Sequence, residues 1–103
     1  MEQALDAYIH MLLETEEYQE YILQKKRIGR FPELKARIDA FRKRSFEVQN
    51  NKNGALDRIE ELEKEYERLV EEPAASDFLE AELAFCRMMQ RHGDKIMEAI
   101  DFE

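Results

Sequence analysis

The most reactive side chain in this sequence is its single cysteine. Cys86 lies between Phe85 and Arg87, in a stretch whose apolar residues recur with helical spacing. A reactive thiol needs an electropositive, partly exposed setting. Consecutive residues of a helix point to different sides, so Arg87 does not provide that setting. We therefore expect Cys86 to be a small buried hydrophobic side chain. The alternative is a redox or metal module that uses Cys86 together with cysteines of a partner.

The two histidines lack the neighbours that a metal site or an acid–base pair requires. His10 and Glu14 are four residues apart, which makes one pair only. His92 lies six residues from Cys86 and on another face of a helix. A zinc site needs three or four converging ligands. We expect both histidines to be surface or half-buried side chains.

Acidic side chains crowd one stretch of the chain, as Glu60, Glu61, Glu63, Glu65 and Glu67. Lys64 lies four residues after Glu60, a spacing typical of an exposed helix surface of mixed charge. Catalytic carboxylate pairs need a cleft that separates their protonation behaviour, and no such cleft is indicated. Phosphate-binding glycine loops and hydrolase motifs are absent. We predict no catalytic residue, no cofactor or metal site, no small-molecule substrate and no enzymatic activity.

The composition narrows the fold class. The chain has 103 residues, of which 39% are charged, with only three glycines and two prolines. These values exclude collagen, turn-dense β folds and low-complexity chains. No apolar run reaches the roughly 18 residues of a membrane span, and the N-terminus does not have the form of a signal peptide. We expect a single helical domain over residues 1–103, in the cytoplasm and away from membranes.

Charge is distributed unevenly along the chain. Residues 25–44, here called the basic block, carry nine basic and two acidic residues, whereas residues 57–82 carry eleven acidic and three basic ones. The simplest interpretation is that oppositely charged helices face each other, within or between chains. The alternative is a basic surface for an acidic partner or for RNA, which would use Lys25, Lys26, Arg27, Arg42, Lys43 and Arg44. The net charge of −8 argues against avid nucleic-acid binding.

Prolines and a polar run divide the chain into helical stretches. Pro32 and Pro73 can each open a helix at its first position, where the missing N–H costs nothing. Residues 50–54, Asn-Asn-Lys-Asn-Gly, predict a flexible turn. Thr15, followed by two glutamates, has the form of a helix start. Residues 2–28 therefore form either one bent helix or two helices that meet near Thr15.

Between these breaks, apolar residues recur every three or four positions, as on one face of a helix. The stripes are Leu5, Tyr8 and Leu12; Tyr18 and Ile22; Leu34, Ile38, Phe41, Ser45 and Val48; and Leu56, Ile59, Leu62, Tyr66 and Leu69. No stretch alternates in the manner of a strand. Each stripe is a narrow seam on a charged helix, and such helices are stabilised by packing. We predict an all-α protein of about five helices in an antiparallel bundle.

The last stripe is wider than the others. Its members are Leu79, Leu83, Cys86 and Met89, flanked by Phe78, Phe85 and Met88 and continued by Ile96 and Ile100. A small chain buries only a modest fraction of its surface, so this seam exceeds what one chain can cover. We expect a homodimer that buries part of it. A helix from another protein in the same groove is the alternative.

Several motifs, taken in order, resemble those of one family. They are Glu17-Tyr18-Gln19 at a helix start, Phe31-Pro32-Glu33-Leu34-Lys35 followed by Ile38 and Phe41, Glu72-Pro73, and Phe78-Leu79-Glu80-Ala81-Glu82-Leu83. Over roughly residues 14–100 the chain resembles the YlbF/YmcA family of small helical bacterial regulators, which includes YheA-like members. Phe31 and Glu72 stand where the family tends to have Asp and Asn helix caps.

The resemblance implies an all-helical dimer without enzymatic activity. The best-known members form a complex with related members and a third protein, which influences RNA processing by an endoribonuclease and, with it, competence, sporulation and biofilm development. Some members hold an iron–sulfur cluster with C-terminal cysteines, which are absent from Asp101-Phe102-Glu103, so we expect no cofactor. We predict a regulatory or adaptor protein that pairs with itself and joins hetero-complexes. The alternatives are an RNA-binding protein that uses the basic block and a purely structural helical dimer.

Overall fold

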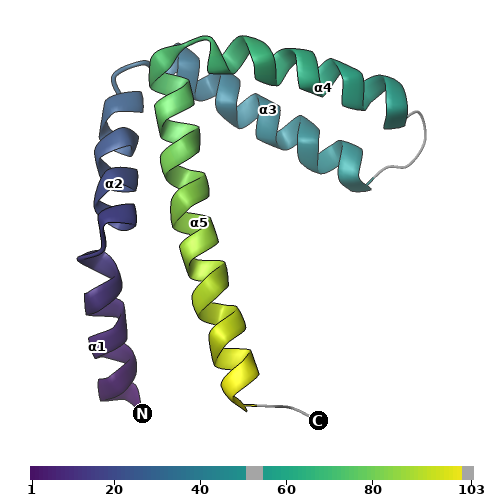
Figure 1. Cartoon of the computed structure of the whole chain (residues 1–103). Coiled ribbons are helices and arrows are strands. Elements are labelled where there is room, and N and C mark those ends of the chain that lie inside the picture. Colours follow the sequence, from purple (N-terminus) through teal and green to yellow (C-terminus); the bar gives the residue numbers. More distant parts are fainter. Residues whose placement is uncertain (51–54, 101–103) are drawn as a thin grey trace. The chain divides into compact units, whose positions relative to one another are not determined.

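Five helices form the protein, as its computed structural model shows for residues 1–50 and 55–100 (Figure 1). They are α1 (Glu2–Leu13), α2 (Glu16–Ile28), α3 (Pro32–Asn50), α4 (Ala55–Val70) and α5 (Pro73–Ile100). No strand occurs within the described residues. The predicted all-α architecture of about five helices is therefore confirmed. The predicted flexible turn at residues 50–54 lies, from residue 51 onward, outside the described residues.

Thr15 separates α1 from α2. Its Oγ1 accepts a hydrogen bond from the backbone N–H of Tyr18 at 3.2 Å and donates one to the carbonyl oxygen of Leu12 at 2.7 Å. The first bond satisfies one of the free N–H groups at the start of α2, and the second adds to the bond that the Leu12 carbonyl oxygen accepts from the backbone N–H of Thr15 at 3.2 Å. Residues 2–28 therefore form two helices, one of the two arrangements that the sequence allowed.

Both prolines open helices where the sequence placed them. The carbonyl oxygen of Phe31 accepts the N–H of Lys35 at 3.0 Å, and that of Glu72 accepts the N–H of Ser76 at 3.0 Å. The residue before each proline thus caps the first turn of α3 and of α5 with its own backbone. Gly93 does not interrupt α5, which is helical from Pro73 to Ile100.

The described chain forms two compact units. The first, unit 1, consists of residues 1–25 and of the chain from Phe78 onward; the second, unit 2, consists of residues 26–77. Each unit is treated separately below. The expectation of a single domain over residues 1–103 stays a prediction.

In unit 1, the N-terminal helices run antiparallel to α5 (Figure 1). Tyr21 stacks on Phe85 with ring centroids 5.4 Å apart and an interplanar angle of 7°, and it also stacks on Phe78 at 6.1 Å. Tyr18 meets the Phe85 ring at 5.6 Å in a tilted arrangement. Offset and tilted pairs of this kind are favourable for aromatic rings. These rings join α2 to α5.

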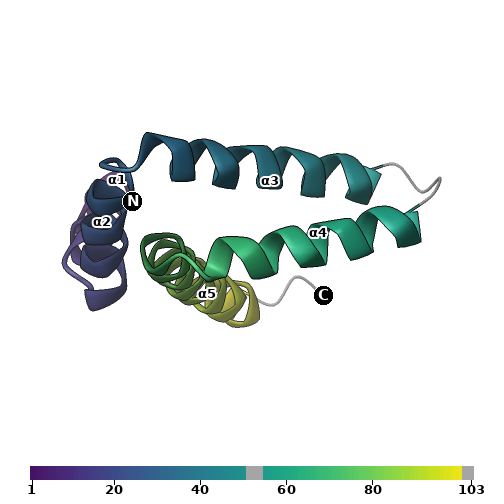
Figure 2. The same cartoon turned by 90° about the horizontal axis from the view of Figure 1, so that it is seen from above.

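In unit 2, α3 and α4 lie side by side and antiparallel, as a helical hairpin (Figure 2). Ile28, Ile38 and Leu69 are fully buried, and Leu34 is nearly so. Ala74 and Ala75, in the first turn of α5, are also buried. Of the apolar stripe predicted for α3, Leu34 and Ile38 are thus buried. No side chain is buried in the described remainder of the hairpin, residues 39–50 and 57–68.

Replacing Ile38 by Ala tests the position of this core. The Ile38 side chain is 1% exposed, and truncation of a buried isoleucine costs about 2–5 kcal/mol of unfolding free energy. Ile59 is 42% exposed on the same hairpin, so Ile59→Ala should cost about 1 kcal/mol or less. Urea denaturation of both variants provides the measurement. Equal losses would show that the core of unit 2 is placed incorrectly.

Candidate protein-interaction surfaces

The side chains that could bind a metal ion do not gather at one site in the described chain. Within residues 1–50 and 55–100, no group of three His, Cys, Asp or Glu side chains is arranged to hold a metal ion. His10 Nε2 lies 3.7 Å from Glu14 Oε1, and both side chains are exposed. The same part of the chain contains no helix with the length and apolar character of a membrane span. The prediction that the protein has no catalytic, cofactor or metal site stays a prediction.

His92 has a structural partner that the sequence did not indicate. The Tyr8 hydroxyl lies 2.8 Å from His92 Nδ1, within hydrogen-bond distance, and the two rings are tilted with centroids 5.9 Å apart. Both side chains are half-buried, as expected for His92. Since 84 residues separate them along the chain, sequence spacing gave no signal for the pair. The contact ties α1 to the C-terminal half of α5.

One side of α5 faces the other helices of unit 1. Its residues recur every three or four positions: Phe78, Ala81, Phe85, Met88 and His92. We call this side the inner face of α5. Phe78, Ala81 and Met88 are buried, and the aromatic members contact the tyrosines of α1 and α2. The residues predicted only to flank the last seam therefore form its buried part.

A second apolar side of α5 is left uncovered. It consists of the exposed Leu83, Cys86, Met97 and Ile100, with the half-buried Leu79 at its N-terminal end, and we call it the outer face of α5. At 3.6 residues per turn it lies about a third of a turn from the inner face. Leu83 is 50% exposed, Met97 54% and Ile100 55%. Leu83, Cys86 and Ile100 belong to the seam that the sequence predicted to be wider than one chain can cover, whereas Met97 was not part of that prediction. All four side chains are exposed in the described chain.

Cys86 is exposed, so the prediction of a buried cysteine was wrong. The error has a physical reason. Cys86 follows Phe85, which faces the tyrosines of α2, and a step of one residue turns the side chain by about 100° around the helix. Cys86 therefore falls on the outer face together with Leu83. Arg87 is exposed as well and, one further step around the helix, lies on the charged side.

Helix α1 presents further uncovered apolar side chains. None of its residues is buried. Leu5 and Ile9 are 47% and 43% exposed, and Leu13 is 40% exposed. Only Tyr8 and Leu12, in the middle of this stripe, are half-buried. Unit 1 thus displays exposed apolar side chains on both α1 and α5.

The basic block is partly neutralised within unit 2. Arg44 of α3 pairs with Glu65 of α4, and Arg27 of α2 pairs with Asp77 in the first turns of α5. These pairs agree with the interpretation that oppositely charged helices face each other. All four side chains are partly exposed, so each pair contributes about 1 kcal/mol or less. Arg27 and Arg44, which were among the residues named for RNA binding, therefore already contact carboxylates of the described chain.

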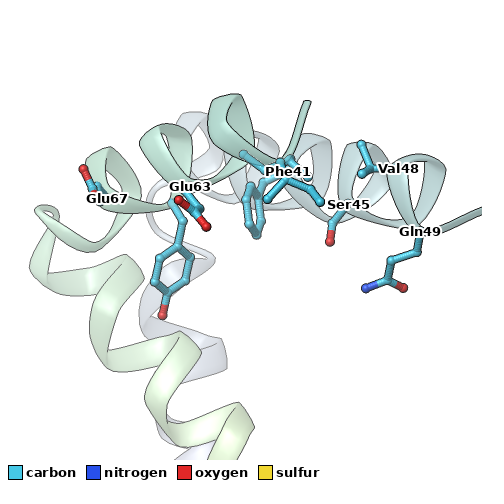
Figure 3. Close-up of a pocket in the computed structure, with 9 residues that line it drawn as sticks. Phe41, Ser45, Val48, Gln49, Glu63 and Glu67 are labelled. Carbon is cyan, nitrogen blue, oxygen red and sulfur yellow. The ribbon is translucent and has the colours of Figure 1, made fainter. Parts of the chain in front are cut away.

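The hairpin of unit 2 contains a groove of about 530 Å³ along one side (Figure 3). Its lining residues are Phe41, Ser45, Val48, Gln49, Ile59, Leu62, Glu63, Tyr66 and Glu67. Phe41 and Tyr66 lie in the middle of the groove, with their ring centroids 5.8 Å apart. Figure 3 shows Phe41, Ser45 and Gln49 pointing to the same side, with Glu63 across from them. The predicted seams of α3 and α4 meet here without closing.

The sequence did not single out this groove as a surface. Tyr66 and Ile59 were assigned to a buried seam, yet they are 45% and 42% exposed. Glu63 and Glu67 were read as ordinary charged surface. The available signal was their spacing, because glutamates four residues apart beside Tyr66 place two like charges at the edge of an apolar stripe. Lys64 makes no ion pair with Glu60 among the described contacts.

Comparison with known proteins gives one match. The family described as "Control of competence regulator ComK, YlbF/YmcA" matches residues 2–101, nearly the whole chain. No curated protein and no solved structure gives a significant match. The family has a regulatory description, and the helical architecture of the described residues agrees with the all-helical protein that the motif resemblance implied. This chain belongs to the YlbF/YmcA family.

Proposed function

We propose that this protein is a cytoplasmic regulatory adaptor without enzymatic activity, which acts as a homodimer through protein–protein contacts. The observation that carries the proposal is the uncovered outer face of α5. Membership in a family of competence regulators supports a regulatory role. The described residues offer exposed apolar side chains for contact, and no group of three His, Cys, Asp or Glu side chains among them is arranged to hold a metal ion.

The outer face suits a pairing of two identical copies. Full burial of a leucine, isoleucine or methionine side chain stabilises a complex by about 1.5–3 kcal/mol. Leu83, Met97 and Ile100 each keep half of their surface in water, so each can contribute roughly half of that value. A two-fold dimer brings the same patch of both copies together, which doubles the number of contributing side chains.

Gly93 supports the same pairing. A glycine inside a helix costs about 1 kcal/mol relative to alanine, and a Cβ built at Gly93 would meet no atom of the described chain within 4 Å. Nothing within the described chain therefore requires a glycine there. The position is exposed and lies seven residues beyond Cys86, on the outer face. A glycine at this place allows the backbone of another helix to approach closely.

Family membership supports a proposal for the pathway. Related proteins are expected to assemble with one another and with a third protein, in a complex that influences RNA processing and, through it, competence, sporulation and biofilm development. We propose that this chain joins such a bacterial complex. The homodimer would serve as its free form or as one of its building blocks.

Three Asp substitutions on α5 test the dimer. Leu83→Asp places a charge on the outer face and should keep the helical circular-dichroism signal while reducing the mass in light scattering from about twice 12.4 kDa to 12.4 kDa. Ala84→Asp, at an exposed position beside that face, should leave the dimer intact. Ala81→Asp, at a position 6% exposed on the inner face, should reduce the helical signal itself. A native chain that stays monomeric at high concentration would contradict the proposal.

Affinity purification of the tagged protein from its native cell tests the adaptor role. We expect mass spectrometry to identify other YlbF/YmcA family proteins and RNA-processing proteins that copurify with the chain. Ala84→Asp should retain them, because it alters neither apolar face of α5. Recovery of the tagged chain alone would leave a purely structural dimer as the better account.

A further inference from the structure

The groove of the α3–α4 hairpin is apolar at its base and acidic along one edge. Ile59, Leu62 and Tyr66 of α4 and Phe41 and Val48 of α3 supply its apolar lining. On the α4 side the edge carries Glu63 and Glu67, both exposed; on the α3 side it carries Ser45 and Gln49, which have no charge. One edge is therefore negative and the other neutral.

The negative edge is not neutralised within the described chain. Glu63 and Glu67 are four residues apart on one helix face, where like charges repel. No ion pair joins either carboxylate to a described basic side chain. On the opposite side of the hairpin the situation differs, because Glu65 pairs with Arg44. Two adjacent uncompensated carboxylates attract a cationic group from outside.

The hairpin also lacks a closed core at this place. All described side chains of residues 39–50 and 57–68 are at least partly exposed. Phe41 and Leu62 are half-buried, while Ile59 and Tyr66 keep more than two fifths of their surface in water. A chain that covered the groove would remove this apolar surface from solvent, which is the main favourable contribution to association.

We propose that the groove is a docking site for an amphipathic helix of a protein partner, with Lys or Arg along one edge of its apolar stripe. From Phe41 to Gln49 the groove follows nine residues of α3, and the eight steps between them at 1.5 Å each make about 12 Å. This length accommodates about two helical turns, so the apolar anchors of the partner recur at i, i+4 and i+7. Its basic edge lies along Glu63 and Glu67.

This inference rests on the proposed function only in that the protein acts through protein contacts. It uses a different helix pair from the outer face of α5. The adaptor would thus bind its own copy with α5 and a basic helix of another protein with the hairpin. A second copy in the groove is the competing occupant, and the experiment separates the two.

Fluorescence anisotropy with two designed peptides tests the proposal on the full chain. Both peptides are fluorescein-labelled helices of about 18 residues with leucines at i, i+4, i+7 and i+11. One carries lysines along one edge of the leucine stripe, and the other carries glutamates at the same positions. We expect the lysine peptide to bind at least about tenfold more tightly than the glutamate peptide.

Charge reversals locate the binding. Glu63→Lys combined with Glu67→Lys should weaken the lysine peptide at least about tenfold and favour the glutamate peptide. The matched control combines Asp57→Lys with Glu61→Lys, which changes the net charge equally at exposed positions away from the groove, and should change the affinity by no more than about twofold. Ile59→Ser should weaken the binding of both peptides. If the Glu63→Lys and Glu67→Lys double variant loses its helical circular-dichroism signal, the Ile59→Ser variant replaces it as the test of the groove.

Four results would overturn the proposal: no binding of the lysine peptide, equal binding of both peptides, equal weakening by the groove and control reversals, or a lower mass of the groove variant in light scattering. The last result would assign the groove to a second copy. An unchanged dimer mass with no peptide binding would remove this inference and leave the α5 dimer standing. A monomeric chain that binds the lysine peptide through Glu63 and Glu67 would remove the α5 dimer and leave this inference standing.

Discussion

The stacking of two α2 tyrosines against two α5 phenylalanines is the contact on which the surface of unit 1 depends. Tyr21 lies nearly parallel to Phe85, and Tyr18 meets the same ring from the side. Aromatic pairs of this geometry contribute about 0.5–1.5 kcal/mol beyond the burial of their area. They also fix the rotation of α5 about its own axis. Once Phe85 points inward, Leu83 and Cys86 must point outward, and the outer face of α5 stays exposed to solvent.

Unit 2 also combines a small buried core with an exposed apolar surface, but its two helices are joined by an ion pair in place of stacked aromatic rings. Narrow apolar seams close at Ile38 and Leu69, near the ends of the hairpin that adjoin its proline-capped turns. Further along, a surface ion pair between Arg44 and Glu65 holds one side of the hairpin, while the other side stays open as the acidic-edged groove. A small chain of charged helices thus buries its limited apolar content in two local cores and leaves two apolar surfaces exposed to solvent.

The sequence predicted the helix ends better than the helix faces. Pro32, Pro73 and the Thr15 hydroxyl act locally, through one backbone torsion or one hydrogen bond, so their effects could be read from the sequence. The choice between the two sides of α5 is not local, because both are apolar. Only the tyrosines of a helix some 60 residues earlier in the chain decide it, and Cys86 was therefore misplaced. The pair of Tyr8 and His92 and the open groove beside Tyr66 depend on the same long-range packing.

The most direct test of the account uses the native thiol of Cys86, which lies in the middle of the outer face and is the only cysteine of the chain. The measurement is the rate of Cys86 alkylation by a maleimide over a wide range of protein concentration. If a second copy covers the outer face, the rate falls as the concentration rises and the dimer forms, whereas in Leu83→Asp it stays at the fast value. A rate that is independent of concentration in a chain that light scattering shows to dimerise would place the dimer contact elsewhere and contradict the account.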